Sequence, residues 1–141
     1  MSDHSNVNII GVAHADGTNT GININLRYGG AVALIEALMA LEDTDPNNPS
    51  KVTADVLHTL YKFGGYGKSS NVHVTPFFTT HDKAIKFASD NKHTIVTIDA
   101  PRRLIFLQER CENGSTHEFL WENIVEAEKV LIDIEVDRRK Y

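Results

Sequence analysis

The order of its periodic segments is the feature that most constrains the fold of this chain. The two longest segments with helical spacing lie in the first half, whereas strand patterns dominate the second half. The expected helices cover residues 31–41, 52–63 and 82–89. The expected strands cover residues 7–12, 22–27, 71–78, 94–99, 104–107 and 130–136. Because helices and strands are grouped rather than regularly alternating, we expect an α+β fold.

Residue alternation predicts which faces of these elements are buried. Residues 22–27 alternate Ile and Leu with Asn and Arg, so we expect a strand with one apolar face in the core and one polar face in solvent. Residues 132–136 alternate in the same way and predict a closing strand. In the first helix, spacing predicts a buried set of Val32, Ile35, Leu38 and Met39, with Leu34 and Leu41 as further candidates.

Length and composition fit a single globular domain over residues 1–141. The chain has 15.7 kDa and 41% hydrophobic residues, enough for one core. A net charge of -5 argues against general binding to nucleic-acid backbone. No apolar run approaches the roughly 20 residues of a membrane span. No signal-peptide pattern opens the chain, so we expect a cytoplasmic protein or one delivered into a target cell without a cleaved signal.

A strand pattern runs directly into a helix pattern around Thr79 and Thr80. Phe77 and Phe78 end the strand, and the two hydroxyls that follow suit the first turn of a helix. Hydroxyls at such a junction can cap the helix and still present a polar edge to a ligand. We therefore expect this corner to form one wall of a site.

Three other kinds of site fit the sequence poorly. Residues 67–69 (GKS) end like a phosphate-binding loop, but Lys62 stands where that motif needs a glycine, and the segment follows a helix instead of a strand. The seven histidines are scattered and no second cysteine is present, so no metal site is predicted. Cys111, the single cysteine, lies among mixed charges with no clear means of stabilising a thiolate.

Arg27 and Glu118 complete a set of three with the Thr79–Thr80 corner. Arg27 closes the alternating strand just before two glycines, where a guanidinium can hold a phosphate or carboxylate through paired hydrogen bonds. Glu118 precedes the apolar residues 119–121, whose bulk can exclude water from its carboxylate. Taken alone, each also suits a surface position.

In this order, the three motifs resemble the mono-ADP-ribosyltransferase fold, in its cholera- and pertussis-toxin-like branch. That family carries an arginine on an early strand, a Ser-Thr-Ser corner after an aromatic strand, and a late Glu-x-Glu or Gln-x-Glu. The similar segments here are LRY at 26–28, FFTTH at 77–81 and THEFL at 116–120. The resemblance covers about residues 22–136. It implies split mixed and antiparallel sheets, with helices mainly in the N-terminal half.

The resemblance implies an NAD-dependent mono-ADP-ribosyltransferase, of a kind that includes toxins and effectors. NAD would be the substrate: the nicotinamide–ribose bond breaks, and ADP-ribose passes to a protein, to another acceptor or to water. Glu118 would stabilise the oxocarbenium-like transition state, and Arg27 would hold the pyrophosphate. Thr79, beside Thr80, would order these two side chains, and Phe77 or Phe78 would stack on nicotinamide.

Several alternatives stay open. Thr116 stands where the family has its first Glu or Gln, which makes water or an acceptor other than arginine more plausible. Glu128, in the Glu-x-Glu of residues 126–128, competes with Glu118 for the catalytic position. His14 is an alternative to Arg27, because a related branch uses histidine there. The competing function is a catalytically inactive module on the same fold that binds a nucleotide or a protein.

Overall fold

One mixed sheet organises the chain. The computed structural model describes residues 4–65, 67, 70–88, 93–110 and 114–138. Its six strands lie in the order β3-β2-β1-β4-β5-β6, in which β1 and β4 are parallel and all other neighbours are antiparallel. The strands are β1 (Ser5–Ala13), β2 (Thr18–Leu26), β3 (Val72–Thr80), β4 (Ile95–Asp99), β5 (Leu104–Gln108) and β6 (Thr116–Leu120). The α+β prediction is confirmed, but these strands form a single sheet rather than a split pair.

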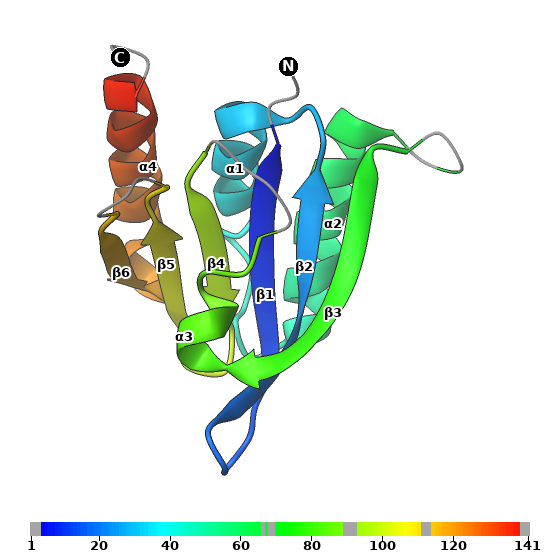
Figure 1. The fold of residues 1–141 in the computed structure, drawn as a ribbon, viewed down its shortest axis with the longest axis vertical. Helices are drawn as coiled ribbons and strands as arrows, with labels where there is room; N and C mark the ends of the chain where they lie inside the picture. Colours follow the sequence, from blue (N-terminus) through cyan, green and yellow to red (C-terminus); the bar gives the residue numbers. More distant parts are fainter. Residues whose placement is uncertain (1–3, 66, 68–69, 89–92, 111–113, 139–141) are drawn as a thin grey trace.

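Helices cover the two faces of the sheet unequally. Figure 1 shows α1 (Gly30–Met39), α2 (Pro49–Gly64) and α4 (Ile124–Arg138) behind the sheet, and α3 (His81–Ala84) in front of it. A 3-10 turn (Trp121–Asn123) leads into α4. The main core lies between the sheet and the three long helices. Within the described residues, no helix is long and apolar enough to cross a bilayer.

The C-terminal segment is a helix, so the predicted closing strand is wrong. Its buried residues follow helical spacing, at Ile124, Ala127, Glu128, Leu131 and Glu135. Ile132, which the alternating pattern assigned to a core face, is 42% exposed. The alternation of residues 132–136 is too short to outweigh the helical spacing that begins at residue 124. Helices therefore are not concentrated in the N-terminal half.

Helix α1 buries a face made of leucines and alanines. Val32 and Met39 are exposed, whereas Leu34, Leu38 and the alanines on the same side are buried. The predicted core set was therefore wrong for Val32 and Met39. The alanine side chains allow α1 to pack closely against α2, α4 and β1 at once.

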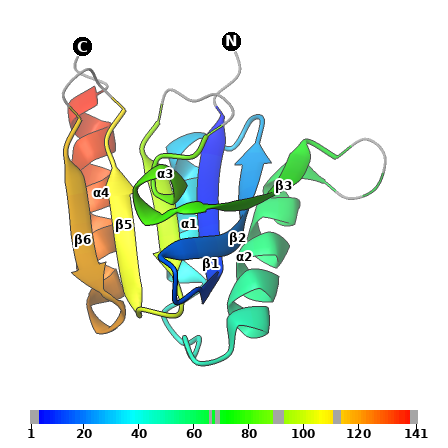
Figure 2. The same cartoon turned by 60° about the horizontal axis from the view of Figure 1, so that its bottom comes forward.

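Both faces of the central strands are buried, which the alternating pattern did not predict. Asn23 and Asn25, expected in solvent, form a buried network with Asn8 and Asn6 of β1. Asn23 Nδ2 donates to Asn8 Oδ1 at 2.8 Å, and Asn25 Nδ2 donates to Asn6 Oδ1 at 3.2 Å. Their cover is residues 85–88, called here the crossing segment, which follow α3 across this face (Figure 2).

Helix α3 ends earlier than predicted, and carbonyl groups at its end and just beyond it bond to the sheet. Asn8 Nδ2 donates to the carbonyl oxygens of Ala84 at 3.0 Å and Phe87 at 2.8 Å. Phe87 N also donates to Ala84 O, a tight turn in place of a further helical bond. The expected helix over residues 82–89 is thus a single turn followed by the crossing segment. Ser89, its expected end, lies outside the described residues.

Candidate functional site at the β3–α3 corner

The predicted junction between strand and helix is present. β3 ends at Thr80, whose backbone is extended, and α3 begins at His81. Thr80 makes no side-chain capping bond to α3, so the predicted capping role is wrong for this residue. Thr79 pairs with Asn19 of β2. The two threonines therefore lie at the corner, and the Thr80 hydroxyl does not cap α3.

Next to this corner, a fully buried carboxylate joins three elements. Asp99, the last residue of β4, has 0% exposure. Its Oδ2 accepts from Arg102 Nη1 at 2.9 Å and lies 3.0 Å from His81 Nε2. The same Nη1 donates to Asn19 Oδ1 at 2.9 Å. These four residues, called here the Asp99 cluster, connect α3, β4, β2 and the β4–β5 turn.

The local sequence explains how Asp99 and Arg102 come together. Asp99 Oδ1 accepts from the backbone N–H of Arg102 at 3.3 Å, so the carboxylate closes the turn that it precedes. Arg103 N donates to Ala100 O, and Arg103 itself takes a left-handed φ of 58°. A buried carboxylate requires cationic or hydrogen-bonding partners. Arg102 and His81 supply both.

His81 is held with one ring nitrogen committed and one available. An ionised carboxylate only accepts hydrogen bonds, so the contact with Asp99 puts the imidazole proton on Nε2. The ring packs edge-on against Phe106, with centroids 5.0 Å apart. Within the part of the chain that the structure describes, Nδ1 has no hydrogen-bond partner, and the side chain is 27% exposed. The geometry suits a proton acceptor that faces solvent.

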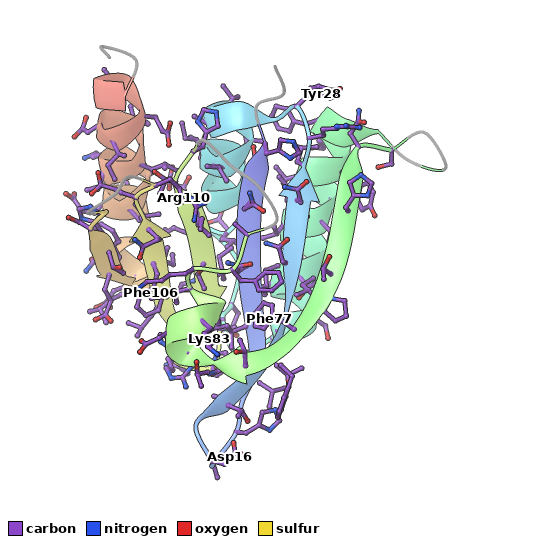
Figure 3. The ribbon with its side chains drawn as sticks, in the orientation of Figure 1. Asp16, Tyr28, Phe77, Lys83, Phe106 and Arg110 are labelled. Atoms are coloured by element: carbon purple, nitrogen blue, oxygen red, sulfur yellow. The ribbon has the colours of Figure 1, made fainter. Side chains whose placement is uncertain are left out.

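Glu118 lies on the same face of the sheet as His81's aromatic neighbour. Glu118 of β6 pairs with Phe106 of β5, which in turn pairs with Thr97 of β4. Directly opposite side chains on paired strands have Cβ atoms about 5 Å apart. Figure 3 shows Phe106 beside α3, close to Lys83. The exposed Glu118 carboxylate and His81 therefore flank one aromatic ring.

Arg27 lies at the opposite end of the sheet from the corner. It follows Leu26, which pairs with Val72 at the start of β3, whereas Thr79 at the other end of β3 pairs with Asn19. The extended chain from residue 19 to residue 27 spans roughly 26 Å at about 3.3 Å per residue. Figure 3 shows the neighbouring Tyr28 far from α3. The structure does not bring Arg27 to Thr79.

The two phenylalanines of the corner have different surroundings. Phe77 is buried over Gly21, where any Cβ would collide with the Phe77 ring, and it packs against Phe87 at 5.6 Å. Phe78 is 64% exposed but projects to the opposite face. There its ring lies 5.5 Å from that of His14, which bonds Thr20 at 2.7 Å. Phe77 therefore lies on the same face as Thr79 but is buried against Gly21 and Phe87, whereas Phe78 and His14 lie on the other side of the strand.

The structure also places Glu128, the alternative catalytic glutamate, and Thr116, which stands where the family has its first Glu or Gln. Glu128 lies in α4, on the helix-covered side of the sheet and away from the corner. Burial and the neighbouring Glu42 raise the pKa of the Glu128 carboxyl above its ordinary value. Thr116 donates its hydroxyl to Gln108 Oε1, and the Gln108 amide donates to backbone carbonyls in the adjoining loop. Gln108 therefore offers no free amide beside Glu118.

The remaining alternatives concern residues 67–69, Cys111 and the histidines. Lys68, Ser69 and Cys111 lie outside the described residues. Among residues 4–65, 67, 70–88, 93–110 and 114–138, no group of three or more His, Cys, Asp or Glu side chains is placed to hold a metal ion.

Sequence reasoning found the corner but missed the cluster beside it. The scattered histidines give no reason to single out His81, and Asp99 is only the last residue of the expected strand over 94–99. One available signal was an acid at the end of an otherwise apolar strand, immediately before a turn with two arginines. Such an acid is buried with the strand and needs a cation nearby. Searches against protein-family models, curated proteins and solved structures found no match.

Proposed function

We propose that the β3–α3 corner binds NAD and cleaves its nicotinamide–ribose bond, passing ADP-ribose to water or to another acceptor. The observation that carries this proposal is the guanidinium of Arg102, which bonds to Asp99 and to Asn19, the strand partner of Thr79. It supplies the corner with the cation that the resemblance expects and that Arg27 does not provide there. Glu118 lies on the same face of the sheet.

The chemistry of these groups suits a pyrophosphate next to a developing positive charge. A guanidinium carries five N–H donors, and only Nη1 of Arg102 is committed to Asn19 and Asp99 among the described residues. The Arg102 side chain is 35% exposed, and the exposed Lys83 of α3 adds a positive charge nearby. Glu118 would accept a hydrogen bond from the ribose 2′-hydroxyl and stabilise the oxocarbenium-like transition state.

Two arginine variants test the proposed site. Calorimetric titration with NAD should show at least tenfold weaker binding for Arg102→Ala and unchanged binding for the matched control Arg27→Ala. Thermal melting checks that both variants stay folded. If Arg102→Ala does not fold, Arg102→Gln replaces it, because glutamine keeps a hydrogen-bond donor for Asp99. If Arg27→Ala weakens binding and Arg102→Ala does not, the proposed location is wrong.

A second pair of measurements separates catalysis from binding. Glu118→Gln should abolish nicotinamide release while leaving NAD binding within about threefold. Retained release in that variant would remove Glu118 from the mechanism. Glu128→Gln is the matched control, and it should release nicotinamide at the unaltered rate because Glu128 lies behind the sheet.

One observation favours the alternative of a binding module without catalysis. Thr116 and Gln108 bond to each other, so the position two residues before Glu118 provides no second acid or free amide. A module of this kind would bind a nucleotide through Arg102 without releasing nicotinamide. If the unaltered protein binds NAD in calorimetry but releases no nicotinamide, this alternative is correct.

A further inference from the structure

We infer that His81 is the general base that deprotonates the acceptor, with Asp99 as its positioning residue. This inference rests on the proposed NAD chemistry and assigns the group that completes it. The starting observation is that a fully buried carboxylate fixes one nitrogen of a partly exposed imidazole. A buried carboxylate next to histidine sets its tautomer and stabilises the imidazolium that forms when the ring takes up a proton.

The orientation of the ring decides which atom is available. Nε2 lies 3.0 Å from Asp99 Oδ2 and carries the proton, so the lone pair is on Nδ1. Phe106 packs against the ring edge-on and prevents it from swinging away from Asp99. Arg102 donates to the same carboxylate oxygen and holds Asp99 in place. Each neighbour therefore holds the imidazole in one orientation.

The reaction balances with these groups alone. The C1′–N bond of NAD breaks, and its electron pair moves to the pyridinium ring, which leaves as neutral nicotinamide. An oxygen of water or of an acceptor hydroxyl bonds to C1′, and its proton passes to Nδ1 of His81. Glu118, on the far side of Phe106, stabilises the positive charge on the ribose during this step. The imidazolium then returns the proton to solvent.

Several charged groups surround His81, and each of them affects how proton transfer to this side chain depends on pH. Asp99 lies behind the ring at the end of β4, and Arg102 faces it from the β4–β5 turn. Asp82 and Lys83 follow it in α3, and Glu118 lies beyond Phe106 on β6. From β2 and β3, the paired residues Asn19 and Thr79 contribute neutral side chains at this corner.

The choice of acceptor gives a direct test. Azide is already deprotonated near neutral pH and needs no general base, whereas water does. His81→Gln, which keeps a donor for Asp99, should lower water-dependent nicotinamide release about 100-fold or more while leaving azide-dependent release within about threefold. The water reaction of the unaltered protein should rise with pH as a single group loses its proton, and this rise should disappear in the variant.

The chain contains a matched control. His117 on β6 also pairs with a carboxylate, Glu109, at 2.8 Å, but the Glu109 side chain is partly exposed. His117 alternates with Glu118 and so projects to the other face of β6. His117→Gln should leave both reactions unchanged. Melting curves of the two glutamine variants establish that each is folded.

Each outcome has one meaning. Equal losses with water and azide in His81→Gln would assign His81 a structural role and overturn the inference. An unchanged water reaction in that variant would overturn it as well. If the unaltered protein releases no nicotinamide with either nucleophile, the proposed function fails and the inference fails with it. Loss of release in Glu118→Gln but not in His81→Gln would leave the proposed function standing without this base.

Discussion

Replacing Asn8 by alanine should destabilise the protein strongly, because this side chain bonds to several elements at once. Asn8 is fully buried at the centre of β1. Its Nδ2 donates to the carbonyl oxygens of Ala84 and Phe87 and, at 3.4 Å, to Thr97 Oγ1, and its Oδ1 accepts from Asn23. One side chain thus attaches the crossing segment to two strands.

The magnitude follows from the groups that the variant leaves behind. Ala84 O keeps a bond from Phe87 N, and Phe87 O keeps a 3.4 Å contact with Asn23, so neither is fully orphaned. Each group therefore costs about 1 kcal/mol, at the low end for buried polar groups that lose a partner. The carbonyl groups of Ala84 and Phe87 and the side-chain amide of Asn23 together give a loss of about 3 kcal/mol. For a chain of this length, that lowers the melting temperature by about 10 °C.

Urea unfolding followed by circular dichroism measures this loss, with Thr75→Ala as the control. Thr75 lies in the same row across the sheet, since it pairs with Asn23 on β2, but it is exposed. Its replacement should change the free energy of unfolding by less than about 0.5 kcal/mol. A loss below about 1 kcal/mol for Asn8→Ala would refute the argument that this side chain holds the crossing segment in place.

The isosteric variant Asn8→Asp adds a dependence on pH. A carboxylate at this buried position would face the carbonyl oxygens of Ala84 and Phe87, so its pKa in the folded protein should lie above the ordinary value of about 3.9. The destabilisation should then be fully present at neutral pH. It should shrink as pH falls through the folded-state pKa, and level off below about 3.9 once the acid is protonated in both states. Stability that is independent of pH relative to the unaltered protein would contradict this sign.

Three further predictions concern the helices and one turn. Leu131→Ala should cost about 2–5 kcal/mol in urea unfolding, and Ile132→Ala less than about 1 kcal/mol, because only Leu131 is buried; the reverse order would favour the strand over α4. Glu128→Gln should raise the melting temperature near pH 7, because burial and Glu42 raise the pKa of the Glu128 carboxyl; the gain should fade below about pH 4, where the acid is protonated in both states. Arg103→Gly should stabilise the fold by about 0.5–1 kcal/mol, because φ is 58° at this residue; an unchanged midpoint would show that the left-handed conformation costs nothing there.

Elements with strong local signals were predictable from the sequence. The helix now seen at Pro49–Gly64 has helical spacing, a proline at its start and glycines at its end. The corner at Thr79 follows from an aromatic strand that meets a polar helix start. In both cases, the residues that decide the structure are within a few positions of one another.

Features that depend on distant partners were not predictable in the same way. The alternating pattern predicts that Asn23 faces solvent, but in the structure the crossing segment covers it. The covering carbonyl belongs to Phe87, far along the chain. An amide side chain is as compatible with water as with buried carbonyls, so its local sequence carries no signal of burial. The same reasoning applies to Asp99, whose partner Arg102 is local but whose partner His81 is not.

Strand direction explains why the motif order alone could not locate the site. Arg27 follows the C-terminal end of β2, and Thr79 lies near the C-terminal end of β3. Because β2 and β3 are antiparallel neighbours, their C-terminal ends lie at opposite ends of the strand pair. The side chains of Arg27 and Thr79 could meet only if both strands were very short. Here, both strands have nine residues and pair along their whole length. A cation that acts with Thr79 must therefore come from another element that reaches the C-terminal end of β3. The β4–β5 turn supplies this cation in Arg102.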